Sequence, residues 1–302
     1  MSSVIFQRFI SQNKADIMEH WRRAFTKSDT EFKELFGVKK DIFQGMLAVV
    51  TIAREERLRK GSRKPKLSAG DQLLLTLQYW REYRTMAHLA FDFGVAKSTV
   101  SDTIVAVENA LIQDKSFHLP GKKALLSKEN VGRTMAVDVT ESPIERPKKK
   151  QKKWYSGKKK RHTIKTQIIA DIETQEIFCT AQVEGAVHDF HLFKVSIRSA
   201  ILWAILLLAD SGYQGLLALH KNSRIPYKKS KNRPLTTEQK LFNRTLSKER
   251  IVIENINARI KTFKMMSERY RNRRKRHLLR MNLVCAILNR ERILATVHQQ
   301  QV

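Results

Sequence analysis

The spacing of the apolar residues changes near residue 130, and this change sets the fold class. Before it, apolar residues recur at intervals of three and four, as in IFQRFISQNKADIMEHWRRAF and EFKELFGVKKDIFQGMLAVV, which predicts amphipathic helices. After it, short runs rich in apolar and β-branched residues are separated by Gly, Pro or Asp, which predicts strands. We therefore expect an all-helical N-terminal part followed by a domain built on a mixed sheet.

The helical part contains a helix-turn-helix pattern. The stretch LSAGDQLLLTLQYWREYRTMAHLAFDFGVAKSTVSDTIVAVENALI predicts helices at 68–82, 85–92 and 97–112, with FGV at 93–95 as the turn between the last two. A Gly-containing turn between two short helices is typical of a DNA-binding helix-turn-helix, although an ordinary helical corner has the same pattern. We expect DNA contacts from the small polar and basic residues that open the helix after the turn, namely Lys97, Ser98, Thr99 and Ser101.

The second half of the chain predicts five short strands and two helices. The strands lie at 133–139, 162–171, 176–184, 206–210 and 224–228, and the helices at 188–200 and 236–263. Three strands, then helix, strand and helix, is the element order of a mixed α/β sheet such as the ribonuclease-H-like fold. The predicted domains are a helical region at 1–67, a helix-turn-helix domain at 68–125, and a ribonuclease-H-like domain with basic C-terminal helices at 130–302.

The charge of the chain favours a polyanionic partner. Lys and Arg total 58 against 29 acids, a formal net charge of +29, and nucleic acid is the commonest polyanion. A basic surface kept for solubility is the alternative. The two cysteines, Cys179 and Cys285, form no CxxC motif, which excludes a zinc finger and fits a reduced compartment.

Membrane insertion and secretion are not expected. The start of the sequence, MSSVIFQRFISQ, lacks the basic and apolar regions of a signal peptide. The longest apolar run, at 200–209, is too short to span a bilayer. We expect an intracellular protein with no membrane partner.

Three acids are candidates for one site. Asp138 ends the predicted strand RTMAVDV and Asp210 ends LLLAD, and active sites of open α/β sheets form beyond the carboxyl ends of strands. In RIVIENINARIK, Glu254 shares one helix face with Arg250 and Lys261 because of their spacing. An Asp at a strand end is also common for structural reasons, so it is the combination that suggests a site.

Converging carboxylates need a cation. Without one they repel each other and tend to protonate, and oxygen ligands of this kind suit Mg²⁺ or Mn²⁺. Two such ions can clamp the attacking and leaving oxygens of a phosphoryl transfer. The predicted cofactor is therefore Mg²⁺ or Mn²⁺, as two ions.

Five ordered motifs resemble a known family. They are AVDVTESPIERP (136–147), WYSGKKKRHTIKTQIIAD (154–171), VHDFHLF (187–193), LADSGYQG (208–215) and RIVIENINARIK (250–261). Together with the helix-turn-helix, they are similar to DDE transposases of the bacterial insertion-sequence-five type, which are related to Harbinger elements. Related transposases often carry Tyr where this chain has Ser247, and no turn signal separates helix from strand in AILWAILLLA (200–209).

The resemblance implies roles for particular residues. Asp138, Asp210 and Glu254 would be the catalytic acids and metal ligands, while Arg250 and Lys261 would bind DNA phosphates near the cut. The partners would be double-stranded DNA with terminal inverted repeats and target DNA. Two element ends must meet, so a homodimer or larger assembly is expected, acting in the bacterial cytoplasm at the nucleoid.

Other basic and polar segments fit the same function. The segment 146–165 holds eleven Lys or Arg around Trp154 and Tyr155, which suits phosphate tracking and base stacking, although Trp154 could pack on its own domain. The run SERYRNRRKRH is either a solvated helix face or a second DNA contact. The candidate DNA-binding residues of these two segments are Lys158, Lys159, Lys160, Arg161, Arg273 and Arg274.

His188 and Asp189 open a predicted helix. Asp189 would then be an N-terminal cap, or the pair would support the site as neighbours of the catalytic acids.

The sequence therefore predicts a metal-dependent transposase that cleaves DNA and joins its ends to a target. The alternatives are a helix-turn-helix regulator that has lost catalysis, and a nuclease that cuts without joining. Charge alone also permits RNA as the substrate.

Overall fold

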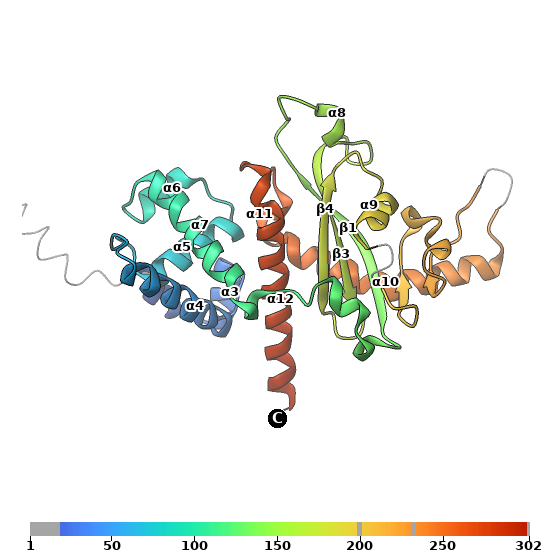
Figure 1. Cartoon of the computed structure of the whole chain (residues 1–302), viewed down its shortest axis with the longest axis horizontal. Coiled ribbons are helices and arrows are strands. Elements are labelled where there is room, and N and C mark those ends of the chain that lie inside the picture. The colour runs from blue at the N-terminus through green and yellow to red at the C-terminus, as the bar shows by residue number, and fades with distance from the viewer. Residues whose placement is uncertain (1–18, 198–200, 231–233, 301–302) are drawn as a thin grey trace, which may run out of the picture. The chain divides into compact units, whose positions relative to one another are not determined.

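The computed structural model describes residues 19–197, 201–230 and 234–300, with side chains through residue 296. The chain divides into two compact units, residues 1–111 and 112–302, coloured from blue to red along the chain in Figure 1. Residues 5–18 of the first predicted amphipathic segment, and 198–200 of the helix predicted at 188–200, lie outside the described residues.

In the N-terminal unit, every regular element from residue 19 onward is a helix, as predicted. Its helices, with α7 ending just past the unit's boundary, are α2 (His20–Phe25), α3 (Asp29–Phe36), α4 (Lys40–Arg59), α5 (Ala69–Arg81), α6 (Met86–Asp92) and α7 (Lys97–Gln113). Helix α5 is the centre of the packing, since it contacts α2, α3, α4 and α6. Its Trp80 is fully buried, and the indole Nε1 donates a hydrogen bond to the buried Glu108 of α7 at 3.3 Å.

The three helices predicted for the helix-turn-helix agree with α5, α6 and α7 to within a residue or two at each end. Local chemistry explains this accuracy. Ser68 and Thr85 cap α5 and α6 by accepting hydrogen bonds from the backbone N–H groups of Asp71 and His88. Gly94 stands in the turn before α7 with φ of +60°, a conformation that glycine adopts without strain.

The second unit is built on a mixed sheet, in the order β2-β3-β1-β5-β6, with β4 also paired to β3. The strands β1, β3 and β4 are antiparallel neighbours, whereas β5 runs parallel to β1, and β6 parallel to β5. Strand bounds are β1 (Thr134–Pro143), β2 (Tyr155–Ser156), β3 (Arg161–Asp171), β4 (Ile177–Glu184), β5 (Leu206–Leu208) and β6 (Ser223–Arg224).

The predicted strands are confirmed in position, with four differences, the first of which is that β5 ends at Leu208, two residues before the predicted end at Asp210. Strand β1 continues to Pro143 because residues 139–143 pair with 163–167 of β3, four residues beyond the predicted end. The last strand, predicted at 224–228, is the two-residue β6. The short helix α8 (Gln151–Trp154) and β2 form within a Lys-rich segment for which no element was predicted.

Alternation along β1 separates the two faces of the sheet. Met135 and Val137 belong to a buried cluster with Phe193 of α9 (Asp189–Ser196). Asp138 points to the other face, where it meets α10 (Thr237–Lys261), because successive strand residues face opposite sides. A turn at residues 203–204 separates α9 from β5, although the apolar run gave no sign of one.

Two C-terminal helices, α11 (Lys264–Ser267) and α12 (His277–Gln300), complete the unit together with 3-10 turns. Helix α12 packs along β4 (Figure 1), and Asn289 exchanges two hydrogen bonds with the backbone of Ile177 at 2.9 and 2.8 Å. Cys179 and Cys285 are buried free thiols. Within the described part of the chain, no helix combines the length and apolarity needed to cross a membrane.

Candidate active site

Asp138 lies in the middle of β1, not at its end as predicted. Asn257 of α10 donates its Nδ2–H to Asp138 Oδ2 at 2.8 Å, and Arg250 Nη2 lies 3.6 Å from Asp138 Oδ1. The prediction failed because the polar residues after Asp138 do not end the strand, but continue the ladder with β3. Asp138 is therefore held by two side chains of the same helix.

Asp210 follows β5 and lies level with Asp138 along the strand direction. The parallel register pairs Ala136 with Leu208, so the acids two residues further along each strand come level. Asp210 Oδ1 accepts a hydrogen bond from the Gly212 N–H at 2.9 Å and so caps a short 3-10 turn. The acids meet where β5 ends, and the chain turns away immediately after Asp210.

Glu254 comes to this place from α10. The spacing predicted one face for Arg250, Glu254 and Lys261, and all three line one cavity. Arg250 is mostly buried against Asp138, whereas Glu254 and Lys261 are exposed. One face of α10 thus supplies both a buried partner for Asp138 and an acid in contact with solvent.

The cavity that these residues line has a volume of about 450 Å³. Five of its side chains are carboxylates and four are cations, so the acids lie within a basic rim. The lining residues are Asp138, Val139, Thr140, Glu141, Lys158, Lys159, Asp189, Asp210, Arg250, Glu254, Asn257, Ala258 and Lys261.

The electrostatics of the cavity reflect this crowding. Burial raises the pKa of the Asp138 carboxyl above its ordinary value; Arg250 opposes this and Asp210, a like charge, adds to it. Desolvation lowers the pKa of Lys261, and the positive charge of Lys159 lowers it further. In this cavity, carboxylates are therefore close to other carboxylates, and lysine ammonium groups are close to one another.

Asp189 also belongs to the cavity. Lys165 Nζ lies 2.8 Å from Asp189 Oδ1 and donates a second hydrogen bond to the Val187 carbonyl at 2.7 Å. A Cβ atom on Gly212 would lie 3.0 Å from Asp210 Oδ1 and 3.6 Å from Asp189 Oδ2. Gly212 therefore leaves room where these two carboxylates face each other.

The β2–β3 hairpin carries two lysines into the cavity. Glu141 anchors the hairpin by accepting hydrogen bonds from Ser156 Oγ at 3.2 Å and Thr163 Oγ1 at 2.7 Å. The turn that follows Ser156 places Lys158 and Lys159 in the cavity wall. Phosphate binding by this basic segment is therefore compatible with a substrate bound at the acids.

No three His, Cys, Asp or Glu side chains of the described residues stand close enough together to hold one ion. The charge of Asp210 raises the pKa of Asp138, whereas Glu254 lies on the exposed side of the cavity. The donors present are nevertheless all oxygens of carboxylates, the type that Mg²⁺ and Mn²⁺ prefer.

Other predicted site residues lie outside this cavity. Lys160 and Arg161 are exposed on the hairpin, and His188 is exposed before α9. Arg273 and Arg274 line a separate basic depression with Asn272 and Lys275.

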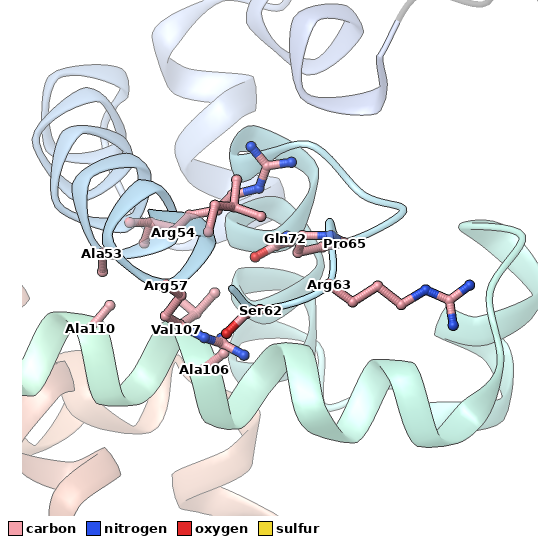
Figure 2. Close-up of a pocket in the computed structure, with 12 residues that line it drawn as sticks. Ala53, Arg54, Arg57, Ser62, Arg63, Pro65, Gln72, Ala106, Val107 and Ala110 are labelled. Atoms are coloured by element: carbon pink, nitrogen blue, oxygen red, sulfur yellow. The ribbon is translucent and has the colours of Figure 1, made fainter. Parts of the chain in front are cut away.

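In the N-terminal unit, the first turn of α7 presents its polar residues to solvent. Lys97 and Ser98 are exposed, and Thr99 and Ser101 are half-buried. A pocket beside α7 is too small for a ligand: its volume of about 30 Å³ holds about two water molecules, and Arg63 points out of it (Figure 2). The exposed start of α7 is thus the candidate DNA-reading surface of this unit.

Sequence reasoning missed Glu141 and Asn257, which line the cavity, and also Lys165 and Tyr213, which lie close to its acids. Asn257 could have been found, because it lies seven residues after Arg250 on the face already identified. Tyr213 is buried, and its hydroxyl has no hydrogen-bond partner among the described residues. Burial raises the pKa of Tyr213 well above its usual value, and the charges of Asp189, Asp138 and Asp210 raise it further.

Comparisons with known proteins show the family of the chain. The family of DDE superfamily endonucleases matches residues 137–290, and the helix-turn-helix of DDE superfamily endonucleases matches residues 65–116. A probable transposase for insertion sequence element IS702 of Microchaete diplosiphon is 46% identical over 262 residues, which cover 86% of this chain and 94% of the relative.

A second relative is more distant. A putative transposase for insertion sequence element IS112 of Streptomyces albus G is 26% identical over 225 residues, which cover 73% of this chain and 80% of the relative.

Proposed function

We propose that this chain, which belongs to the DDE superfamily of endonucleases found in insertion-sequence transposases, is an insertion-sequence-five-type transposase that cuts and joins DNA. Its second unit would be a ribonuclease-H-like domain with the catalytic acids Asp138, Asp210 and Glu254. The observation that carries the proposal is the single cavity where these acids meet four cations.

The donor set fits divalent metal ions. Burial and Asp210 make the charged form of Asp138 costly, and a divalent cation relieves that cost. Asp138, Asp210 and Glu254 would hold Mg²⁺ or Mn²⁺, and two ions would suit phosphoryl transfer. When bound, the ions lower the pKa of the attacking hydroxyl and stabilise the leaving oxygen.

The side chains around the acids position the substrate. Lys158, Lys159 and Lys261 line the cavity with their cationic groups, so we assign them to the non-bridging oxygens of the phosphate. Arg250 was predicted to bind phosphate as well. Because it is mostly buried beside Asp138, we assign it instead to holding that carboxylate, together with Asn257.

Two displacements would occur in this cavity. In the first, water adds to phosphorus as the P–O3′ bond breaks, which leaves a 3′-hydroxyl at the element end. In the second, that hydroxyl attacks a phosphodiester of the target, and the bond to the departing 3′ oxygen breaks. Both steps depend on orientation and on stabilisation of charge, so no covalent enzyme intermediate is required.

The N-terminal unit would recognise the DNA. Lys97, Ser98, Thr99 and Ser101 are among the first five residues of α7, at the end of such a helix that reaches the major groove. We propose that residues 68–125 bind the terminal inverted repeats and that 1–67 support them. Pairing of two element ends requires a homodimer or larger assembly, which we place at the nucleoid in the bacterial cytoplasm.

Cleavage of a labelled duplex tests this function. The duplex carries the terminal repeats that flank the gene, and wild type and Asp210→Asn are compared in Mg²⁺ and in EDTA. We expect nicking at the repeat end that requires Mg²⁺ and is absent in the variant. Repeat-specific binding without cleavage would show a DNA-binding protein that has lost catalysis.

A second substrate separates joining from cutting. A pre-cut repeat end with a free 3′-hydroxyl is incubated with supercoiled target DNA, and joined products are counted. The proposal predicts joining that requires Mg²⁺ and Asp210. Cutting of the first substrate without joining of the second would indicate a nuclease.

A further inference from the structure

A second groove lies beside the β2–β3 hairpin, at the end of the sheet where α8 lies (Figure 1). Its volume is about 430 Å³, close to the volume of about 450 Å³ of the acid cavity. Two cations and two rings line it, and none of these lining residues is acidic. They are Arg146, Gln151, Lys152, Tyr155 and His162.

The walls of this groove are ordered by local contacts. Arg146 donates Nε–H and Nη2–H to Gln151 Oε1 at 2.9 and 2.8 Å. Tyr155 pairs with His162 across the hairpin, and their rings meet edge to face with centroids 5.6 Å apart. The Tyr155 side chain is still 43% exposed, so a fixed aromatic ring is open to a ligand.

Trp154, the residue that the sequence suggested for base stacking, is less available. The guanidinium of Arg274 lies 4.4 Å from the centre of its ring, and the side chain is only partly exposed. This cation–π contact ties α8 to the basic run near residue 274. The exposed ring of the segment is therefore that of Tyr155.

The groove and the acid cavity share one hairpin. Ser156 Oγ donates to Glu141, which lines the acid cavity, whereas the preceding residue, Tyr155, lines the groove. His162 and Ile168, the β3 partners of Tyr155 and Asp138, are six residues apart, so Tyr155 and Asp138 lie on the same face of the sheet. A DNA strand that leaves the cavity can follow the basic hairpin to the groove.

We propose that this groove binds an unpaired base of the DNA strand whose end is processed in the acid cavity. The base stacks on Tyr155, and Arg146 and Lys152 bind the adjoining phosphates. A basic groove with an exposed aromatic ring is the usual arrangement for binding single strands. The inference rests on the proposed function, because it takes the substrate to be DNA held at Asp138 and Asp210.

The sheet sets the distance between the two places. Tyr155 pairs with His162, and Asp138 pairs with Ile168 on the same strand, β3. These positions are separated by roughly 20 Å at about 3.3 Å per strand residue. A stacked DNA strand covers that length in about six nucleotides. The base bound by Tyr155 therefore lies about six nucleotides from the phosphate that is cut, or fewer if the strand is extended.

Photocrosslinking with 5-iodouracil tests the proposal directly. The probe is a repeat-end duplex with an unpaired flank, carrying 5-iodouracil at one flank position at a time. It is bound to the full chain in EDTA, so that no cleavage is needed, and the crosslinked peptide is identified by mass spectrometry. We expect crosslinking to Tyr155, strongest within about six nucleotides of the cut.

Variants separate stacking from folding. Tyr155→Ala is expected to lose the crosslink and to weaken binding of the flanked duplex by about tenfold or more, with binding of the fully paired duplex unchanged. Tyr155→Phe should keep the affinity. The matched control is Tyr227→Ala, at another half-exposed tyrosine of the same unit, which should change neither measurement.

The outcomes distinguish this proposal from the proposed function. Crosslinks that map to Trp154, or that avoid Tyr155 at every flank position, would overturn the proposal that the groove binds a base, even if the protein cleaves the duplex. Crosslinking to Tyr155 by a protein that never cleaves would support the groove and contradict the transposase activity.

Discussion

The two units of the chain bring their functional residues together in different ways. In the helical unit, the candidate DNA contacts Lys97, Ser98, Thr99 and Ser101 are neighbours on one turn of α7. In the sheet unit, Asp138, Asp210 and Glu254 come from a central strand, a strand end and a long helix. A recognition surface can thus be local, whereas the cavity requires the whole unit to be folded.

The units also differ in how they place charge. Lys97 and Ser98 are exposed to water, so their substitution should leave the fold intact. Asp138 is largely buried beside Asp210, which raises its pKa, and Arg250 and Asn257 offset part of the cost. We therefore expect substitutions in α7 to change DNA affinity, and substitutions in the cavity to change the rate of cleavage.

The largest effect should come from Asp138→Asn. Losing a carboxylate of the metal site should lower the cleavage rate by about 10³-fold or more, while DNA binding stays within about twofold because α7 is unchanged. Single-turnover cleavage and fluorescence anisotropy measure the two quantities. Glu173→Gln, at an exposed acid outside the cavity, is the control for the charge change.

The sheet unit should also be sensitive to acid through His277. Burial, together with the positive charge of Arg280, lowers the pKa of His277 from 6.5 to about 4. The unfolded chain binds a proton between these pH values and the folded chain does not. Stability is therefore lost as the pH falls from 6.5 towards 4, by about 3 kcal/mol in total.

Denaturant unfolding at pH 7 and at pH 4.5 measures this loss. His277→Gln keeps a polar side chain that cannot titrate, so its stability should fall less than that of wild type over this range. Equal losses in both proteins would show that other groups account for the acid sensitivity.

A smaller effect is expected for Asn257→Ala. Its Nδ2–H stabilises the charged form of Asp138, so losing it should raise the pKa of that carboxyl and move the acidic limb of the pH–rate profile to higher pH. The rate at neutral pH should fall by about 10-fold to 100-fold. A lower rate with an unshifted profile would contradict the positioning role.

The smallest effect should be that of Lys97→Ala. Loss of one phosphate contact should weaken binding to repeat DNA by about tenfold and reduce the slope of log K against log salt by about one. Titrations at several salt concentrations measure both. Lys27→Ala, at an exposed lysine of the same unit outside α7, should change neither the affinity nor the slope.

Local sequence signals explain what could be predicted. The helices around the turn were predicted closely because Ser68, Thr85 and Gly94 mark their ends chemically. The acids were identified from the strand pattern and from family resemblance. The position of Asp138 within β1 was missed, because the length of that strand depends on pairing with β3.

Long-range contacts explain what was missed. The register of β1 and β3 places Glu141 in the cavity wall and Lys165 beside Asp189. Tyr213 lies near the acids because it ends the 3-10 turn that Asp210 caps. The exposed aromatic ring is that of Tyr155 and not that of Trp154, because Arg274, from a distant part of the chain, lies over the Trp154 ring. None of these contacts has a signal within its own segment.

The most direct test of the division between the units is a paired measurement of affinity and rate. The dissociation constant for repeat DNA and the nicking rate at saturating protein in Mg²⁺ are measured for wild type, Asp210→Asn and Lys97→Ala. We predict that Asp210→Asn binds as wild type does and does not nick, whereas Lys97→Ala binds more weakly and nicks at the wild-type rate once saturated. Nicking by Asp210→Asn at the wild-type rate would contradict the assignment of catalysis to the acid cavity.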